Sequence, residues 1–467
     1  MATTLKEMID SDLGKTISLL TADTKDIAEI DKYVAEYEEL DRTIRDTQVG
    51  TVQKDKVIGT GEKSKTVKAI KIPVSFQKKI VSTSCAFEFG APVTLVPSEQ
   101  NELFVELKRL WKENRVDDKL QQAKLIQKTQ TQCALHFFLK DVDATLKATT
   151  DNGAVKKQIK VNVLSHKEGK MSPYFDSTGD MIAFVWEYAS KDVEGKTINN
   201  VWIFDSTSVY KCDSSAGDMT LLSSELHGFD RIPVVYMYQD YPEWHDVQSL
   251  IDRFEVSLSK LGASNDYSGY PLLKTYGDVS SLPDRNDDGK TINFPMKIDE
   301  DSGKEVHGDA EFLTNDNAPE SVKLEMEKIE QLIYSLSYTP NLSFENMKSI
   351  GTLSGVALKL MFLDSIIKSK LNEGENRTIV ERIINIFIGG TITSTMIKLK
   401  GKPLTVDVKF NSILPNDTVE AVNIVTGAIG AGAMSKKTAV EYIGINNDTE
   451  AELALIEADK AGVQPTV

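Results

Sequence analysis

The sequence EWHDVQSLIDRFEVSLSKLGASN, residues 243–265, carries a long helical pattern. Its apolar residues recur every three or four positions, on one helix face, and are Val247, Leu250, Ile251, Phe254, Leu258 and Leu261. At about 1.5 Å per residue, this helix reaches roughly 30 Å. A second stretch, residues 317–338, repeats the pattern with Val322, Met326, Ile329, Ile333 and Leu336. Pro340 ends it. The sequence therefore predicts two long amphipathic helices.

A short β-rich segment separates these helices. Residues 267–316 are rich in Gly, Asp and Pro, and residues 270–276 and 291–296 have the composition of strands. After the second helix, residues 341–353 lack any periodicity, which is typical of a loop. We expect a small β excursion between the helices and a loop after them.

The remaining C-terminal sequence predicts mainly helices. A third amphipathic helix begins at Ser354, with a kink or break expected at Gly374. Residues 404–410 alternate apolar and polar side chains, which predicts a half-buried strand. Short helices are expected at 418–429 and 435–443.

The first 242 residues combine helices and strands. Phe76–Phe89 predicts a helix that Gly90 and Pro92 end. β-Branched and aromatic runs predict five strands, at residues 134–139, 159–164, 181–188, 201–204 and 234–238. These features favour an α+β domain with an antiparallel sheet. Residues 47–70 lack an apolar stripe and predict an exposed loop.

The composition excludes disorder of the whole chain, because 40% of the 467 residues are hydrophobic and 27% are charged. The 54 Lys and Arg residues are outnumbered by 70 Asp and Glu residues, so the formal net charge is −16. A protein with this charge is not suited to gripping many phosphates. Any contact with nucleic acid is therefore expected to be weak and local.

Cysteine usage and hydropathy indicate an intracellular protein. Cys85, Cys133 and Cys212 lie far apart without a CxxC pair, so we expect neither a disulfide framework nor a Cys/His zinc site. The first fifteen residues are charged, and no run reaches the roughly 18 apolar residues of a membrane span. We expect a reducing compartment and no membrane partner.

Two segments resemble ligand-binding motifs incompletely. GTGEKSKT, Gly59–Thr66, has the composition of a phosphate loop, but Ser64 stands where that loop needs a glycine before its lysine. DRNDDG, Asp284–Gly289, has the oxygens of a calcium loop, but Pro295 stands where the bidentate Glu belongs. A solvated turn is expected there. A cytosolic nucleotide-dependent enzyme that uses the degenerate phosphate loop stays open as the alternative function.

Catalytic motifs are otherwise missing from the sequence. The five His residues are scattered, and no Ser or Cys has the local signature of a nucleophile. We therefore predict that the protein is not an enzyme and uses no cofactor or catalytic metal.

Five stretches occur in the order found in one protein family. They are PVSFQKKIVSTSCAFEFGAPVTL (73–95), SPYFDSTGDMIAFVWEYA (172–189), HGFDRIPVVYMYQD (227–240), SGVALKLMFLDSIIKSKL (354–371) and VDVKFNSILPNDTVEAV (406–422). Together with the order of elements, they resemble the portal proteins of tailed bacteriophages, specifically the siphophage-type branch.

The resemblance implies an α+β portal fold that forms a ring of about twelve subunits at one capsid vertex. Double-stranded DNA would be packaged and ejected through this ring. The implied parts are an N-terminal region and α/β wing (1–242), a stem helix (243–266), a β-rich clip (267–316), a second stem helix (317–340), a tunnel loop (341–353), a long helix with a wing return strand (354–415) and a helical crown (416–467).

The two helical stripes agree with a ring. If both helices stand side by side around a pore, one neighbour within the subunit cannot cover both stripes, and a second copy would bury the rest. The residues alone also allow the alternative that the stripes form one closed helical core in a monomer.

The resemblance also implies partners and contact residues. The terminase large subunit and a head-tail adaptor would dock on the clip, at Asp284, Arg285, Asp287, Asp288 and Lys290. The tunnel loop would face DNA, weakly and without sequence preference, through Asn346, Lys348, Ser349 and Thr352. Major capsid and scaffold proteins would contact the ring. The protein would lie in the virion at the portal vertex, after assembly in the host cytoplasm.

Overall fold

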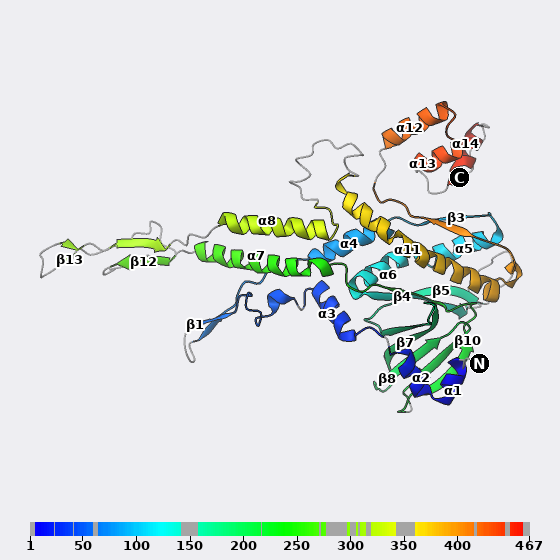
Figure 1. The fold of residues 1–467 in the computed structure, drawn as a ribbon, viewed down its shortest axis with the longest axis horizontal. Coiled ribbons are helices and arrows are strands. Elements are labelled where there is room, and N and C mark those ends of the chain that lie inside the picture. Colours follow the sequence, from blue (N-terminus) through cyan, green and yellow to red (C-terminus); the bar gives the residue numbers. More distant parts are fainter. Residues whose placement is uncertain are drawn as a thin grey trace. The chain divides into compact units, whose positions relative to one another are not determined.

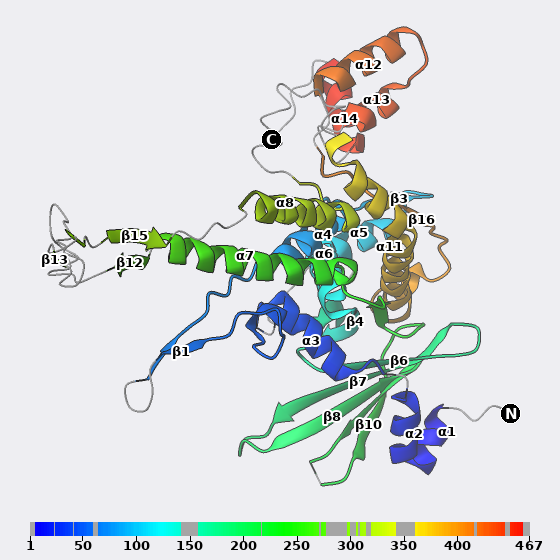
Figure 2. The same cartoon turned by 60° about the vertical axis from the view of Figure 1, so that its left-hand side comes forward.

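The computed structural model of the chain, drawn in Figures 1 and 2, describes residues 5–22, 24–40, 42–58, 64–141, 157–215, 217–269, 272–276, 297–298, 305–306, 309–313, 319–341, 360–414, 418–443 and 449–460. Backbone contacts divide these residues into two compact units. Unit 1 contains the described residues of Met1–Val34, Gln77–Trp244 and Ser337–Val467. Unit 2 contains those of Ala35–Phe76 and His245–Leu336.

A three-stranded antiparallel sheet lies at the centre of unit 1. Its strand order is β11 (Val234–Tyr238), β4 (Gln132–Asp141) and β5 (Lys157–Leu164). The helices that share its hydrophobic core are α4 (Phe76–Phe89), α5 (Glu102–Glu113), α6 (Val116–Gln130) and α11 (Leu363–Gly390).

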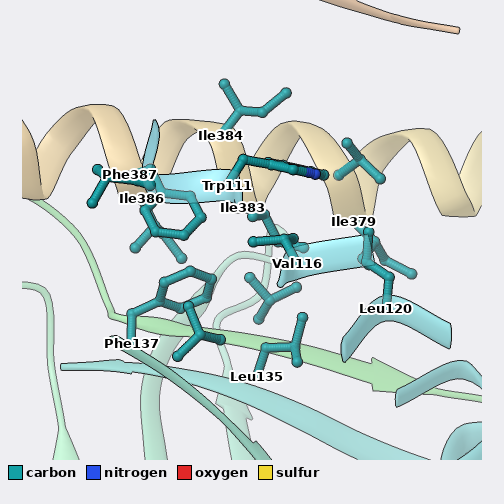
Figure 3. Close-up of a cluster of buried hydrophobic side chains, with 14 of the residues drawn as sticks. Trp111, Val116, Leu120, Leu135, Phe137, Ile379, Ile383, Ile384, Ile386 and Phe387 are labelled. Carbon is teal, nitrogen blue, oxygen red and sulfur yellow. The ribbon is translucent and has the colours of Figure 1, made fainter. Parts of the chain in front are cut away.

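This core joins segments that are distant in the sequence. Helix α5 begins where the side chain of Asn101 accepts a hydrogen bond from the Phe104 amide, at 3.0 Å. Phe137 on β4 lies below Phe387 on α11 in Figure 3, and the two rings meet edge to face with centroids 5.2 Å apart. Trp111 on α5 belongs to the same cluster. Helix α11 is therefore held to unit 1 along its C-terminal half.

A five-stranded antiparallel sheet forms the second layer of unit 1. Its strand order is β10 (Thr220–Leu226), β9 (Ser208–Asp213), β8 (Thr197–Phe204), β7 (Met181–Lys191) and β6 (Lys170–Phe175). Alternate residues of β7 face opposite ways, as a strand requires: Phe184 joins a cluster with residues of the three-stranded sheet, and Val185 joins one with helices α1 (Leu5–Ser11) and α2 (Leu13–Leu20). Figure 2 shows these two helices beside the sheet.

The C-terminal part of unit 1 contains a strand pair and three helices. Strand β16 (Val406–Lys409) pairs antiparallel with β3 (Thr94–Pro97), and its Val406 and Val408 are buried while Asp407 and Lys409 are exposed. A π-helical turn, η4 (Thr391–Thr395), and a 3-10 turn, η5 (Ile397–Leu399), precede it. Helices α12 (Thr418–Gly430), α13 (Lys436–Ile443) and α14 (Thr449–Lys460) pack on one another in chain order.

Unit 2 is built on a helical hairpin. Helices α7 (Gln248–Gly269) and α8 (Pro319–Leu336) pack against each other (Figure 1). Between them in the chain, β12 (Leu272–Tyr276) pairs antiparallel with β15 (Asp309–Leu313), and β13 (Lys297–Ile298) pairs with β14 (Glu305–Val306).

The rest of unit 2 comes from an earlier part of the chain. Helix α3 (Ile27–Tyr37) leads into this unit, and the 3-10 turns η1 (Thr43–Arg45) and η3 (His245–Val247) belong to it. Strand β1 (Lys56–Ile58) pairs antiparallel with β2 (Lys65–Val67).

The α+β content predicted from the sequence is confirmed, and so are both long helices, the five strands of the first 242 residues and the half-buried strand β16.

Two expectations are wrong. Helix α11 runs without interruption through Gly374, where an added Cβ would meet nothing within 4 Å, because a glycine lowers helix stability without removing a hydrogen bond. The exposed loop at 47–70 contains the β1–β2 hairpin, because exposed backbone can satisfy its hydrogen bonds across a hairpin without an apolar face.

Candidate functional site

The contact residues that the sequence predicted lie outside the described residues. Asn346, Lys348, Ser349 and Thr352 fall in 342–359. The five predicted docking residues fall in 277–296, and they are Asp284, Arg285, Asp287, Asp288 and Lys290. Both sets stay predictions.

The phosphate-loop candidate does not have the structure that nucleotide binding requires. Residues 59–63 lie outside the described residues, but Lys65 and Thr66 lie on β2, where they pair with Ile58 and Val57 of β1. A phosphate loop instead leads from a strand into the N-terminus of a helix, whose amides point at the phosphates. The structure therefore does not support the nucleotide-dependent alternative.

The buried thiols and one buried histidine are not poised for catalysis. Burial raises the pKa of Cys85 to about 12 and that of Cys212 to about 11, so both stay protonated near neutral pH. Burial also lowers the pKa of His136 to about 4, which keeps this side chain neutral. Within the described residues, no group of three or more His, Cys, Asp and Glu side chains could hold a metal ion. No helix of this part of the chain has the length and apolarity that crossing a bilayer demands.

Polar contacts fix residues 72–76 to helix α7 in unit 2. The Arg42 guanidinium lies 2.5 Å from the Glu255 carboxylate, and both side chains are fully buried. Glu255 also accepts a hydrogen bond from the Val74 amide at 2.7 Å, and Arg42 donates to the Val74 carbonyl at 2.6 Å. Burial raises the pKa of Glu255, because these favourable contacts only partly offset its loss of water.

An aromatic cluster adds apolar contact at the same place. The Phe76 ring meets the ring of Phe254 on α7 edge to face, with centroids 5.3 Å apart. It also meets the ring of Tyr334 on α8, with centroids 5.8 Å apart. Phe76 therefore contacts both helices of the hairpin.

Two helices each expose a row of apolar residues whose positions differ by four or eight, and such a row forms a ridge along the helix. On α8 the exposed ridge contains Leu324, Leu332 and Leu336, and on α11 it contains Leu363, Ile367 and Leu371. Ridges of this spacing are the surfaces by which helices interdigitate with other helices. Each ridge is thus shaped to pack against a further helix.

A chain of six alternating charges lies in unit 1. Its members come from α4, α6, α11 and the segment after β11, and they are, in order of contact, Glu375, Lys124, Glu88, Lys128, Glu243 and Lys368. The successive nitrogen–oxygen distances are 3.4, 3.4, 2.9, 3.0 and 2.7 Å. The middle side chains are buried, whereas Glu375 at one end is 48% exposed and Lys368 at the other is 21% exposed. We name this group the charge chain.

Glu88 is the centre of the charge chain. Besides its two lysines, its carboxylate accepts hydrogen bonds from the side-chain amides of Asn372 and Asn376 on α11, at 2.7 and 2.9 Å. Burial disfavours its ionised form, but Lys128 and Lys124 outweigh that cost and lower the pKa of Glu88. Glu88 is therefore ionised and fully coordinated at neutral pH.

Glu243 stands between two ammonium groups. Burial again disfavours ionisation, but Lys128 and Lys368 lower the pKa of Glu243 to about 2. The Ser84 hydroxyl donates a hydrogen bond to the same carboxylate at 2.7 Å. The charge chain thus connects helices α4 and α6 to Glu243, which lies two positions before His245, where the chain enters unit 2.

The sequence analysis did not identify the charge chain. One local signal was present: on α6, Lys124 and Lys128 follow Leu120 at intervals of four, so two charges occupy the face that starts with a buried leucine. The acidic partners come from distant segments, and no spacing within α6 indicates them.

The chain is similar to known proteins in sequence family and in fold. A family model described as "Phage portal protein, SPP1 Gp6-like" matches residues 22–466. No curated protein matches the chain. Among solved structures, "Neck of native GTA particle computed with C12 symmetry" is similar at 11% identity and a TM-score of 0.42, covering 79% of this chain and 91% of that chain. "Neck of empty GTA particle computed with C6 symmetry" is similar at 12% identity and a TM-score of 0.41, covering 79% and 89%.

Proposed function

Because this chain belongs to the phage portal protein family, a structural and non-enzymatic family, we propose that it forms a closed ring of about twelve subunits at one capsid vertex. In this proposal the ring is the channel through which double-stranded DNA is packaged and later ejected. The protein is accordingly part of a phage particle, and its assembly in the host cytoplasm belongs to the proposal.

The exposed ridge of α8 is the observation that carries the ring. Among the described side chains of α7, no large hydrophobic residue is exposed, whereas α8 leaves Leu324, Leu332 and Leu336 exposed. In a closed ring, each copy offers the same surface to its neighbour, so a ridge that is unused in one subunit becomes a lateral contact. Burying these leucines against a second copy is favourable by roughly 25 cal/mol per Å² of apolar surface.

The net charge of the chain suits a channel that confines DNA without holding it. At a formal charge of −16 per subunit, a ring repels the phosphate backbone overall. Isolated cations then give brief contacts that do not depend on base sequence. We assign this role to Lys348, with Asn346, Ser349 and Thr352, in the proposed tunnel loop at 341–353.

The seven-part organisation predicted from the sequence belongs to the same proposal. The clip, residues 267–316, docks the terminase large subunit during packaging and a head-tail adaptor afterwards. Two of its described strands, β12 and β15, form an antiparallel ladder, in which Lys274 lies 3.3 Å from Glu311. The wing contacts major capsid and scaffold proteins.

Electron microscopy and light scattering of the purified full-length protein test the ring. We expect annular particles from the wild type and monomers from Leu332→Asp, because an aspartate on the ridge would be desolvated in the lateral contact. Val193→Asp is the matched control, since Val193 is exposed in a turn of the five-stranded sheet, and it should form rings. A wild-type monomer at every micromolar concentration tried would refute the ring, and rings of Leu332→Asp would refute the α8 contact.

A further inference from the structure

The charge chain holds the N-terminal half of α11 at two places. Lys368 and Glu375 stand seven residues apart, which is two helical turns, so both lie on one face of α11. Lys368 contacts Glu243 at 2.7 Å, and Glu375 contacts Lys124 at 3.4 Å. The two ends of the charge chain therefore both belong to this helix, and its buried middle belongs to α4 and α6.

Lys368 also contacts the first residues of unit 1 after the hairpin in the sequence. Its ammonium group donates a hydrogen bond to the Ser337 carbonyl at 3.2 Å and lies 5.8 Å from the centre of the Tyr338 ring. Ser365, one turn earlier, donates to the Tyr338 carbonyl at 2.8 Å. Glu243 stands just before the chain enters the hairpin, and Ser337 stands just after it returns. One side chain therefore contacts both connections.

The backbone at the return connection needs such support. Tyr338 has a φ of 57°, in the left-handed region that residues other than glycine seldom adopt. This conformation persists only where the surroundings hold it. The Ser365 hydroxyl donates a hydrogen bond to the Tyr338 carbonyl and the Lys368 ammonium group donates one to the Ser337 carbonyl, and both bonds hold this strained turn against α11.

We propose that Lys368 is a positioning residue that latches α11 to both connections of the helical hairpin, and that the buried middle of the charge chain is the fixed base of this latch. The inner ion pairs stay closed because opening them would leave an unpaired charge without water. The Lys368–Glu243 ion pair can open, because Lys368 is partly exposed and water can replace Glu243 as the partner of its ammonium group. Under the proposed function, which this inference deepens, the latch keeps Ser337 and Tyr338, which precede 342–359, in a fixed relation to α11.

Hydrogen exchange of the full-length protein tests the latch without requiring a ring. In Lys368→Met we expect amide exchange to rise about tenfold or more at Tyr338 and over 363–371, with α6 and β4 unchanged. Lys368→Arg should retain protection, because a guanidinium can reach the same acceptors. Lys370→Met is the control, since the exposed Lys370 pairs with Glu373 rather than with the charge chain.

Several outcomes would overturn the latch. Wild-type exchange at Tyr338 and 363–371 in Lys368→Met would show that Lys368 holds nothing there. A rise spread over β4 and α6 would show a general stabilising role instead. If Lys368→Met does not fold, Ser365→Ala must raise exchange at Tyr338, or the proposal fails. Absence of rings in microscopy would refute the proposed function and leave this result standing, so the two failures are distinguishable.

Discussion

At the scale of single residues, the charge chain shows how burial and pairing together decide protonation. Each of its inner carboxylates has lost water, which by itself would raise the pKa, and each is nevertheless ionised because two lysines lie beside it. The buried charges of this chain also make the arrangement of α4, α6 and α11 specific, because a different packing would separate a buried charge from its partner.

Glu243 gives a testable pH dependence. Its pKa falls from an ordinary value of 4.5 to about 2 in the folded protein, so the unfolded chain binds its proton more readily. The contribution of Glu243 to stability is therefore present above about pH 4.5 and is lost as the pH falls from 4.5 towards 2. Urea unfolding between pH 6 and pH 3 should show a falling free energy of unfolding.

The control for this prediction is Glu243→Gln, which removes the titrating group. It should be less stable at pH 6, because Lys128 and Lys368 lose a partner, and its stability should decline less steeply towards pH 3. Equal slopes for wild type and variant would assign the acid sensitivity to other carboxylates and contradict the shift at Glu243.

At the scale of elements, the helices of unit 2 depend on one earlier segment. Phe76 touches an aromatic ring on α7 and another on α8, and Arg42 reaches α7 through Glu255. Arg42, Val74 and Phe76 therefore connect this earlier segment to the two helices.

Phe76→Ala should destabilise unit 2, by about 3–5 kcal/mol, because it removes a buried aromatic ring and leaves a cavity between two helices. The measurement is urea unfolding followed by hydrogen exchange of the α7 and α8 amides. Phe175→Ala, at a partly exposed ring on the edge strand β6, is the control and should cost far less. Unchanged exchange in α7 and α8 would mean that the aromatic contacts do not hold the hairpin.

At the scale of the whole molecule, the predicted role of Lys348 can be separated from assembly. Lys348→Glu should form rings like the wild type, because the predicted lateral contact is on α8, and it should reduce the DNA retained in filled particles, because an added negative charge repels phosphates. Microscopy checks ring formation, and the length of DNA that the particles protect from nuclease measures the DNA content.

Lys15→Glu, which makes the same charge change at an exposed side chain of helix α2, is the matched control and should package normally. Normal filling of particles with Lys348→Glu would show that the charge of the tunnel loop is irrelevant to DNA retention.

The types and order of the elements could be predicted from local spacing. The stripe from Val247 to Leu261 requires a helix because residues three and four apart share one face, and the alternation at Val406 and Val408 requires a strand with one buried side. These periods depend only on neighbouring residues. The kink predicted at Gly374 does not form, because the low helix propensity of one glycine is outweighed by the buried residues that follow it on α11.

The pairing of distant charges lay beyond any local pattern. Glu88, Lys128, Glu243 and Lys368 come from four separate segments. In the sequence, each is a charged residue of the kind that usually lies exposed to solvent. Folding removes these side chains from water together, and each buried charge then requires an oppositely charged partner to offset the lost hydration. Local periodicity thus determines which elements form, whereas the mutual burial of distant segments determines which side chains share a site, because the cost of losing water arises only once the segments meet.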